Sequence, residues 1–425
     1  MKNNHTPEIR FSGFTGNWVE YKFGDIYDVV SGYAFKMSDY VQGGVPIING
    51  ESIQHGSIST KNLNFLPEGF SDKYQNFILD TGDIVLGLNR PITNGKLKIA
   101  QVPKDLHGAL LYQRAGKIII LNNSNINFSY QLLGNEVSKF VLKEAVGSDQ
   151  PFISTTKLKK WLICIPALEE EQTEIGNFLK QLDDTIALHQ QELTTLKQTK
   201  QGFLQKMFPK EGESVPEIRF AGFSGDWKEC KLTDVKDRED KYSFTGGPFG
   251  SDLKSSDYTV EGIRIIQLQN IGDGEFLNSY KIYTSEKKAI ELSSNLIYPG
   301  EIIIAKMAEP LARATIMPDF DEKYLMASDG IRLKIDKNDY DTYFILTLIN
   351  SPFFRKEALS NSTGTTRKRI GLVTLGNLPI VLPNLNEQTK IGNFFKQLDE
   401  TIVLHQRELD SLKDTKKAFL QKMFV

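Results

Sequence analysis

The 425-residue sequence predicts an α+β protein: two similar mixed α/β domains separated by a pair of long antiparallel helices, an intramolecular coiled coil with pseudo-two-fold symmetry. Three observations support this prediction. A long stretch with heptad patterning occurs twice, a short box of aromatic and charged residues occurs twice, and the segments between them alternate short apolar runs with glycine turns. The chain is therefore a tandem duplication in the order box, variable segment, helix.

The box marks the beginning of each half. Residues 7–24, PEIRFSGFTGNWVEYKFG, return at 216–233 as PEIRFAGFSGDWKECKLT. The second copy follows PKEGESV at 209–215, a polar stretch with proline and glycine that is typical of a linker.

The variable segments share a frame of short strands. In each half a glycine turn precedes a short run of apolar residues, and two further segments match between the halves but differ in their polar residues. The matched pairs are GDIVL (82–86) with GEIII (300–304), VPIINGESIQHG (45–56) with IRIIQLQNIGDG (263–274), and LLYQRAGKIII (110–120) with LMASDGIRLKI (325–335). In the last pair the copy starts one residue further on, which sets Gln113 and Arg114 against Ala327 and Ser328. These runs predict two similar strand-rich domains, each closed by a long helix.

The helical stretch is the best-preserved part of the duplication. Between residues 171–208 and 387–424, 28 of 38 positions are identical. Apolar residues recur at alternating spacings of four and three, which is a heptad seam. The seam positions are Ile175, Leu179, Leu182, Ile186, His189, Leu193, Leu196, Lys200, Phe203 and Met207, and in the copy Ile391, Phe395, Leu398, Ile402, His405, Leu409, Leu412, Lys416, Phe419 and Met423.

The simplest way to bury this seam is to pack one helix against the other. About 40 residues make each helix roughly 60 Å long at 1.5 Å per residue. A parallel pair would require the second variable segment to run back along that whole length, so we expect an antiparallel pair.

The two helices also agree at positions off the seam, which a coiled coil does not require. A recent duplication is one explanation, but it would have kept the variable segments alike as well. We therefore expect two equivalent docking surfaces for two copies of one partner. The candidate partner-binding residues are Gln172, Asn177, Lys180, Gln181, Gln388, Asn393, Lys396 and Gln397.

Composition restricts the classes of function. The net charge is −2 and the pI about 6.3, so the chain has no overall basic signature. Two scattered cysteines are too few for a disulfide framework and fit a reducing compartment, and we see neither a signal peptide nor a membrane-spanning run. We expect a cytoplasmic protein without membrane contact.

Motifs for chemistry are also missing from the sequence. It contains no Gly-rich Walker loop, no Asn-Pro-Pro-Tyr or Asp-Pro-Pro-Tyr tetrapeptide and no HExxH pair, and its five histidines are dispersed. We expect no catalytic residues, no metal and no cofactor in this chain.

The junctions before the helices carry a family resemblance. They are GSDQPFISTTKLKKWLICIPALEEEQ (147–172) and GTTRKRIGLVTLGNLPIVLPNLNEQ (364–388), and each ends in a short strand, Pro, Leu and then Glu-Gln at the helix start. Together with the box and the heptads, they make the whole chain resemble the specificity (S) subunits of Type I restriction-modification enzymes. The second junction has TTRKR where the first has SDQPF, so contacts there are not assumed to be equivalent.

The resemblance implies a DNA-reading subunit that does no chemistry itself. Two target-recognition domains would each read one half of a bipartite, asymmetric site on double-stranded DNA. The helices would dock two methyltransferase subunits and, with them, restriction subunits; S-adenosylmethionine, ATP and Mg are expected only in those partners. The predicted organisation is target-recognition domain 1 at 1–160, a central conserved region with its long helix at 161–208, the linker at 209–215, target-recognition domain 2 at 216–378 and a C-terminal conserved region with its long helix at 379–425.

Candidates for DNA contact are mainly polar residues in loops where the two domains align but differ, because Arg, Lys, Asn and Gln distinguish base edges. In the first domain they are Tyr33, Lys36, Asn49, Glu51, Ser52, Arg90, Asn94, Lys96, Gln113, Arg114, Gln150 and Ser154. In the second they are Phe249, Ser251, Gln267, Gln269, Asn270, Lys306, Arg313, Ser328, Asp329, Thr365, Arg367, Lys368 and Arg369. Residues 27–160 hold 14 basic against 11 acidic residues and residues 236–378 hold 19 against 20, so we expect the isolated chain to bind DNA weakly.

A different class of protein remains open from the sequence. A duplicated coiled-coil adaptor, or a surface or phage structural protein without DNA binding, would also use soluble paired helices. A pull-down separates the two, because the adaptor predicts no methyltransferase partner.

Overall fold

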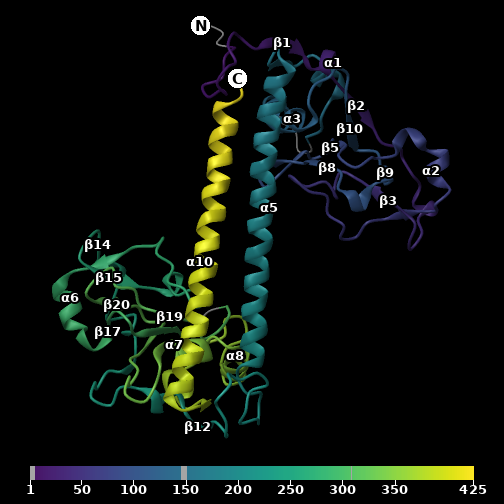
Figure 1. Cartoon of the computed structure of the whole chain (residues 1–425). Coiled ribbons are helices and arrows are strands. Elements are labelled where there is room, and N and C mark those ends of the chain that lie inside the picture. The colour runs from purple at the N-terminus through teal and green to yellow at the C-terminus, as the bar shows by residue number, and fades with distance from the viewer. Residues whose placement is uncertain (1–4, 145–150, 308) are drawn as a thin grey trace. The chain divides into compact units, whose positions relative to one another are not determined.

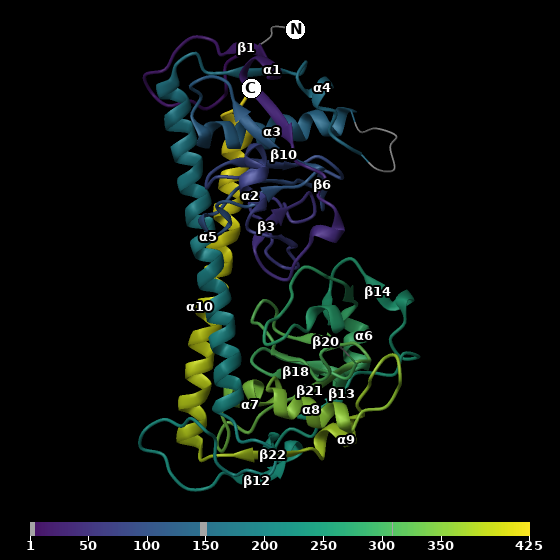
Figure 2. The same cartoon turned by 90° about the vertical axis from the view of Figure 1, so that its right-hand side faces the viewer.

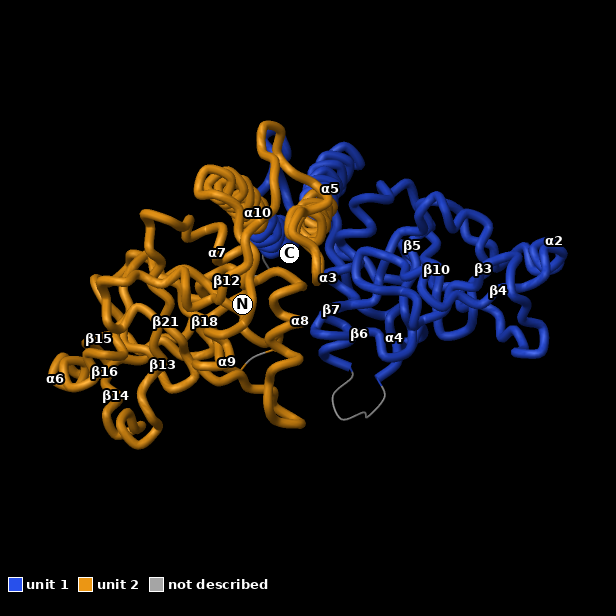
Figure 3. Tube along the Cα trace, turned by 90° about the horizontal axis from the view of Figure 1, so that it is seen from below, with its two compact units in different colours: residues 1–190, 408–425 blue, residues 191–407 orange. Residues whose placement is uncertain are grey.

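The computed structural model describes residues 5–144, 151–307 and 309–425 of the chain. The chain divides into two units, coloured separately in Figure 3: unit 1 comprises residues 1–190 with 408–425, and unit 2 comprises 191–407. The two long helices, α5 (Glu169–Lys206) and α10 (Leu385–Lys422), are each uninterrupted in Figures 1 and 2, and each contributes a part to both units. Among the described residues, no helix has the length and apolar character needed to span a bilayer.

Unit 1 is built on a four-stranded antiparallel sheet. Its strand order is β2 (Tyr27–Ser31), β10 (Ala115–Ile120), β5 (Ile84–Gly87) and β8 (Ile99–Gln101). A smaller sheet has the order β4 (Phe65–Leu66), β3 (Val45–Ile48) and β9 (Leu110–Leu111), and two strand pairs join β1 (Val19–Lys22) to β11 (Leu162–Ile165) and β6 (Ile92–Thr93) to β7 (Lys96–Leu97). The helices are α1 (Phe23–Ile26), α2 (Phe70–Lys73), α3 (Ile126–Glu144) and α4 (Thr155–Leu158), with short 3-10 turns at Met37–Asp39, Gln75–Phe77 and Lys104–Leu106.

Unit 2 repeats this plan with a larger second sheet. The first sheet has the order β13 (Phe244–Gly246), β21 (Gly330–Leu333), β18 (Ile302–Ala305) and β19 (Ala314–Ile316). The second has the order β14 (Tyr258–Thr259), β16 (Tyr283–Thr284), β15 (Ile263–Ile266), β20 (Tyr324–Met326) and β17 (Leu296–Ile297), and β12 (Lys228–Lys231) pairs with β22 (Pro379–Leu382). The helices are α6 (Glu286–Glu291), α7 (Thr342–Ile349), α8 (Pro352–Ser360) and α9 (Leu372–Gly376), with 3-10 turns at Leu232–Val235, Ser255–Asp257, Leu268–Asn270 and Ser293–Asn295.

Strand registers confirm the predicted alignment of residues 45–48 with 263–266, and they shift the later pair by one residue, so that Gln113 is equivalent to Ser328 and not to Ala327. In unit 1, β3 runs parallel to β9 with Ile47 opposite Leu110. In unit 2, β15 runs parallel to β20 with Ile265 opposite Leu325. The two halves are therefore duplicates in topology as well as in sequence.

The helix segments within unit 1 pack antiparallel. Phe178 of α5 meets Phe419 of α10 edge to face, with ring centroids 4.9 Å apart. Further along α5, Asp183 accepts a hydrogen bond from Lys416, 2.5 Å away. Residue numbers rise on one helix as they fall on the other, which confirms the predicted direction.

Unit 2 contains the same arrangement with the helices exchanged. Phe394 of α10 meets Phe203 of α5 edge to face at 5.0 Å. Asp399 of α10 pairs with Lys200 of α5 at 2.5 Å. The lysine that occupies an apolar seam position in each copy thus neutralises an aspartate on the facing helix segment.

In each unit, residues of the box form hydrogen bonds and an ion pair with the ends of the two helix segments. In unit 1 the Arg10 guanidinium donates to both carboxylate oxygens of Glu171 in the first turn of α5, at 2.6 and 2.7 Å. The Ile9 amide donates to the Lys422 carbonyl at the end of α10, 3.0 Å away. In unit 2 Arg219 binds Glu387 in the same bidentate way, and the amide of residue 218 donates to the carbonyl of residue 206. This explains why box and helix were preserved together.

A glycine inside each long helix lets a domain helix dock end-on. A Cβ at Gly176 would lie 2.5 Å from the Phe128 amide nitrogen at the start of α3. A Cβ at Gly392 would lie 2.3 Å from the side chain of Asp341, which caps α7. The backbone approaches so closely that only glycine fits, despite its cost of about 1 kcal/mol within a helix.

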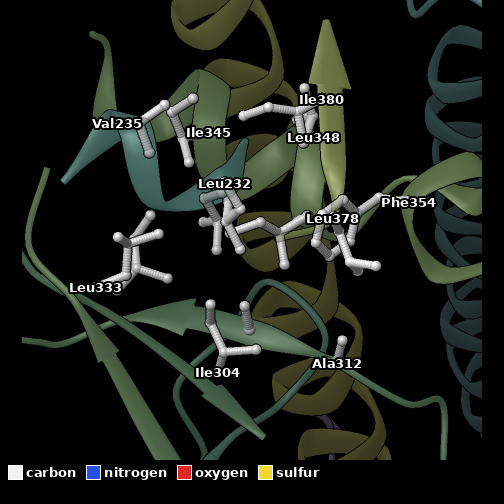
Figure 4. Packing of buried hydrophobic residues seen from close by; sticks show 14 of the residues in the cluster. Leu232, Val235, Ile304, Ala312, Leu333, Ile345, Leu348, Phe354, Leu378 and Ile380 are labelled. Atoms are coloured by element: carbon white, nitrogen blue, oxygen red, sulfur yellow. The ribbon is translucent and has the colours of Figure 1, made fainter. Parts of the chain in front are cut away.

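The apolar core of each unit unites its sheet, its domain helices and its helix pair. In unit 2 the core extends from the sheet through α7 to Phe395 on α10. Figure 4 shows Leu232 and Leu378 within this core, between Ile304 of β18 and Ile345 of α7. The domain and its helix segments therefore share one core, while the predicted boundaries between them stay a prediction.

Candidate nucleic-acid interface

The predicted DNA-contacting residues of unit 1 lie in loops that leave one edge of the main sheet. Because its strands are antiparallel, the ends of β2 and β5 meet the beginnings of β10 and β8 at this edge. The parallel strands β3 and β9 also end here, since the amide after β9, at Tyr112, donates to the Ile48 carbonyl. We call the loops at 32–36, 49–52, 88–96 and 112–114 the loop edge of unit 1.

Tyr33 stands on an aromatic cluster at this loop edge. Its ring lies 4.6 Å from that of Tyr74 and 5.1 Å from that of Phe35. Its carbonyl accepts a hydrogen bond from the Gln113 amide at 2.9 Å. Tyr33 and Gln113 are thus held together although 80 residues separate them in the sequence, and Lys36 is exposed nearby in the chain.

Two candidates in the loop after β3 are used by the loop itself. Asn49 Oδ1 accepts from the amides of Glu51 and Ser52 at 2.8 and 2.9 Å. The buried Ser52 hydroxyl donates to the Asn49 carbonyl. Glu51 remains exposed at the tip.

The loop after β5 contains a tight hairpin with basic side chains on either side of it. Asn94 and Gly95 have positive φ of 51° and 74°, as a two-residue hairpin turn between β6 and β7 requires. Arg90 and Lys96 flank this hairpin and are exposed, and Arg114 is exposed after β9. The turn therefore accounts for Asn94. The side chains of Arg90, Lys96 and Arg114 are exposed to solvent.

Unit 2 has the equivalent loop edge, formed by the loops at 247–251, 267–270 and 327–329, and here it is hollowed. A surface pocket of about 540 Å³ is lined by six of the predicted residues. They are Phe249, Gln267, Gln269, Arg313, Ser328 and Asp329. Phe249 is 81% exposed beside Ser251, which is also exposed.

The predicted residues in and beside this pocket differ in burial and in hydrogen bonding. Asn270 is fully buried, and its amide nitrogen donates to the carbonyls of Leu277 and Tyr280. Arg313 is held by the Leu268 carbonyl at 2.8 Å. Gln269 is exposed and its amide donates to Gln267 Oε1 at 3.2 Å, while the Gln267 amide donates to the Tyr258 hydroxyl at 3.4 Å.

A small ion network joins the pocket to the second junction. Lys306 Nζ donates to the Ser328 carbonyl at 3.1 Å, and Arg369 pairs with Asp329 at 3.0 Å. Burial lowers the pKa of the Lys306 ammonium, and the charge of Arg369 lowers this pKa further. Lys306 thus supports the loop at Ser328, while the Arg369 side chain is half exposed.

The second junction forms a basic loop. Thr363 and Arg369 bond to each other through both amides, at 2.8 and 2.9 Å, which closes the loop. Thr365, Arg367 and Lys368 are exposed at its tip. The closure presents a cluster of cations beside the loop edge of unit 2.

The first junction presents an aromatic side chain that the sequence analysis missed. Phe152 is 70% exposed, although its backbone pairs with Asn89 and the next amide donates to the Leu88 carbonyl at 2.8 Å. In unit 2 the amide of Ile370 donates to the Lys306 carbonyl in the same way, so Phe152 stands where Arg369 stands in the copy. Aligning the two junctions on Ile153 and Ile370 would have found it.

The remaining candidates of this junction are placed differently. Ser154 is the N-cap of α4 and accepts from the Lys157 amide. Gln150 lies outside the described residues.

The candidate partner-binding residues divide by burial. Gln172 and Gln388 are 3% and 2% exposed, and their amides donate to the carbonyls of Pro166 and Pro383. These bonds explain why the two glutamines recur, so a docking surface rests on the other six positions. Those six, all exposed, are Asn177, Lys180, Gln181, Asn393, Lys396 and Gln397.

Comparison with known proteins identifies the family. The family model for the Type I restriction modification DNA specificity domain matches residues 15–198 and again 224–414. This chain belongs to that family. The duplicated match coincides with the duplicated fold, one copy of the specificity domain for each half.

Similar proteins carry the same description. The Type I restriction enzyme MjaVIII specificity subunit of Methanocaldococcus jannaschii is 36% identical over 187 residues, which is 43% of this chain and 44% of that relative. The chain thus spans less than half the length of this relative. The EcoBI specificity subunit of Escherichia coli is 22% identical over 398 residues, 90% of this chain and 79% of the relative.

Solved structures show the same fold. The Type I restriction-modification S subunit from M. genitalium superposes with a TM-score of 0.66 over 99% of both chains at 15% identity. A structure that describes complex assembly and conformational transition of the type I R-M system gives 0.53 over 96% of this chain and 97% of that one at 19% identity. The α+β fold class is confirmed.

Proposed function

We propose that this chain is the DNA specificity subunit of a Type I restriction-modification system, and that each loop edge reads one half of a bipartite, asymmetric site. The observation that supports it is the pair of equivalent loop edges with unlike side chains. The strand registers align Gln113 with Ser328 and Arg114 with Asp329. Side chains that differ at equivalent places on equivalent scaffolds favour different bases.

In this proposal, different residues of each loop edge contact the bases and the phosphates. Gln113, Arg114, Gln267 and Gln269 have the amide or guanidinium groups that bind base edges in pairs of hydrogen bonds. Exposed cations such as Lys96 and the basic loop suit phosphate oxygens, which position a protein on the duplex. Asn49, Ser52 and Asn270 support the loops in this proposal.

The docking part of the proposal concerns the six exposed helix positions. Three lie near the start of α5 in unit 1 and three near the start of α10 in unit 2, at matching sequence positions. We propose that each set binds one methyltransferase subunit, so that the complex holds two, with restriction subunits joining through them. In this proposal the chain is non-catalytic and cytoplasmic, and S-adenosylmethionine, ATP and Mg bind to the partners.

A domain exchange tests the reading function. Residues 27–160 are replaced by 236–378, and the variant is co-expressed with the methyltransferase subunit in a host that lacks the parent gene. Two identical domains should turn the methylated motif into an inverted repeat of the second half-site, as symmetric proteins read symmetric sites. An unchanged methylated motif would overturn the assignment of reading to these segments.

Native mass spectrometry tests the docking. The parent chain should carry two methyltransferase subunits, and Lys180→Glu or Lys396→Glu should each lower the number to one. Lys413→Glu, on a helix position outside both sets, is the matched control and should keep two. A parent chain that never takes up a second copy contradicts the proposal.

A further inference from the structure

Three side chains with metal-binding atoms converge in unit 1 at the strand pair of β1 and β11. His5, Glu20 and Cys164 place an imidazole nitrogen, a carboxylate oxygen and a thiol sulfur within 4.8 Å of one another. The His5 Nδ1 atom lies 3.1 Å from Cys164 Sγ. The histidines are dispersed along the chain, so the sequence predicts no metal site, and the cluster forms only through folding.

The backbone holds all three residues in place. Glu20 and Cys164 face each other directly across the antiparallel pair of β1 and β11. The His5 carbonyl accepts a hydrogen bond from the amide of Trp18 at 2.7 Å, and the Trp18 side chain is buried at 2% exposure. The cluster is therefore not an accident of long surface side chains.

The duplication provides an internal comparison. In unit 2 the amide of Trp227 donates to the Ser214 carbonyl at 2.8 Å, so Ser214 takes the place of His5. Glu229 faces Val381 across β12 and β22, so Val381 takes the place of Cys164. The carboxylate is common to both units, whereas the imidazole and the thiol occur together in one unit and are replaced together in the other.

We propose that His5, Glu20 and Cys164 bind one divalent cation of the zinc class. Thiolate, imidazole and carboxylate are the ligands that Zn²⁺ takes, at about 2.0–2.3 Å, and three protein ligands with a water complete a tetrahedral shell. Donors around one ion are then about 4 Å apart or less, so small side-chain rotations suffice to close the shell.

The surroundings fit a cation. The negative charges of Glu20 and Glu136 act on the Cys164 thiol, and the charge of Lys139 acts on it in the opposite sense. A bound divalent ion replaces the thiol proton and offsets the negative charge around it. The ion would also tie residue 5 to the strand pair that leads into α5.

Metal titration of the full, tag-free chain tests the proposal. Zinc binding is measured by calorimetry, and cobalt is used as a spectroscopic probe, because a thiolate ligand gives it a charge-transfer band. The parent chain should bind one equivalent with that band. Cys164→Val and His5→Ser, which introduce the unit 2 residues, should each weaken binding at least tenfold, whereas Cys230→Ser should leave binding unchanged.

A variant that gains a second zinc site tests the proposal in a way that a misfolded variant cannot imitate. Ser214→His combined with Val381→Cys should build a second site beside Glu229 and raise the stoichiometry to two. Ser214, Glu229 and Val381 line a pocket of about 310 Å³, so there is room for the new side chains. Equal binding by the parent and Cys164→Val, or no binding by the parent at micromolar free zinc, would overturn the proposal and leave a simple hydrogen bond between His5 and Cys164.

Discussion

Arg10 and Glu171, which are 161 residues apart in the chain, form a bidentate ion pair in unit 1. The Glu171 side chain is 1% exposed and also accepts from the indole of Trp18 at 3.3 Å. This pair ties the box to the first turn of α5. It recurs as Arg219 and Glu387 in unit 2.

Removing the arginine should be costly. Arg10→Met leaves the buried Glu171 carboxylate without its counter-charge, and we expect a loss of about 3–5 kcal/mol in the free energy of unfolding of unit 1. Urea denaturation combined with hydrogen exchange of the α5 amides measures it. Arg219→Met should act equally on unit 2, and Arg10→Met with Glu171→Met should recover part of the loss. A loss below about 1 kcal/mol in the single variant would contradict a buried pair.

Phe152 and Arg369 occupy equivalent places in the two units, and each should help to determine which bases its own unit reads. Phe152→Arg should alter or relax the half-site read by unit 1 without changing the other half-site, because the loop edge of unit 2 is untouched. A good base contact discriminates by about 1–3 kcal/mol, so relaxed positions should be evident in genome-wide methylation maps. Arg369→Phe should act on the other half-site alone. Two unchanged half-sites would exclude these positions from base contact.

The basic loop should contribute through phosphates. Arg367→Ala with Lys368→Ala should weaken DNA binding by the assembled complex on all sequences alike. The slope of log K against log salt should fall by about 0.9 for each phosphate that the variant no longer binds. Fluorescence anisotropy over a salt series measures the slope. Lys337→Ala, beyond the opposite end of β21, is the control and should change neither value.

Thiol chemistry should report the protonation of Cys230. Burial, followed by the negative charges of Asp234 and Glu229, raises the pKa of this thiol to about 11. In a Cys164→Val background, alkylation at pH 8 should be about a hundredfold slower than for a free thiol near pKa 8.5, and its rate should rise about tenfold per pH unit up to pH 10. The folded state holds this proton more tightly than the unfolded state, so the stabilisation is complete below about pH 8.5 and declines as the pH rises toward 11. A rate that levels off near pH 9 would contradict a raised pKa.

The duplication, the long helices and their antiparallel packing could all be predicted from the sequence alone. Heptad spacing can be recognised without a structure because an α-helix repeats every 3.6 residues, and a shared seam needs only apolar side chains at those positions. The alignment of Ile47 with Ile265 also followed from sequence, since apolar runs after glycine turns mark the same strands in both halves.

The contacts of the off-seam residues could be assigned only from the folded structure. Gln172 and Gln388 looked like docking residues because they recur, yet each bonds a proline carbonyl inside its unit. Gly176 recurs because the start of α3 contacts it. Recurrence in sequence does not distinguish a contact inside the fold from a contact with a partner, because both constrain a residue equally.

The same limit applies to the new sites. Phe152 is not among the DNA-contacting residues predicted from the sequence, because those are mainly polar, and its exposure is set by a backbone pairing with Asn89 across 63 positions. Strand pairing sets Glu20 opposite Cys164, more than a hundred positions away, and the amide of Trp18 holds the His5 carbonyl. Local patterns in a sequence report the structure of neighbouring residues, whereas the register of distant strands depends on how the whole core packs, and that packing placed these three ligands together in one unit.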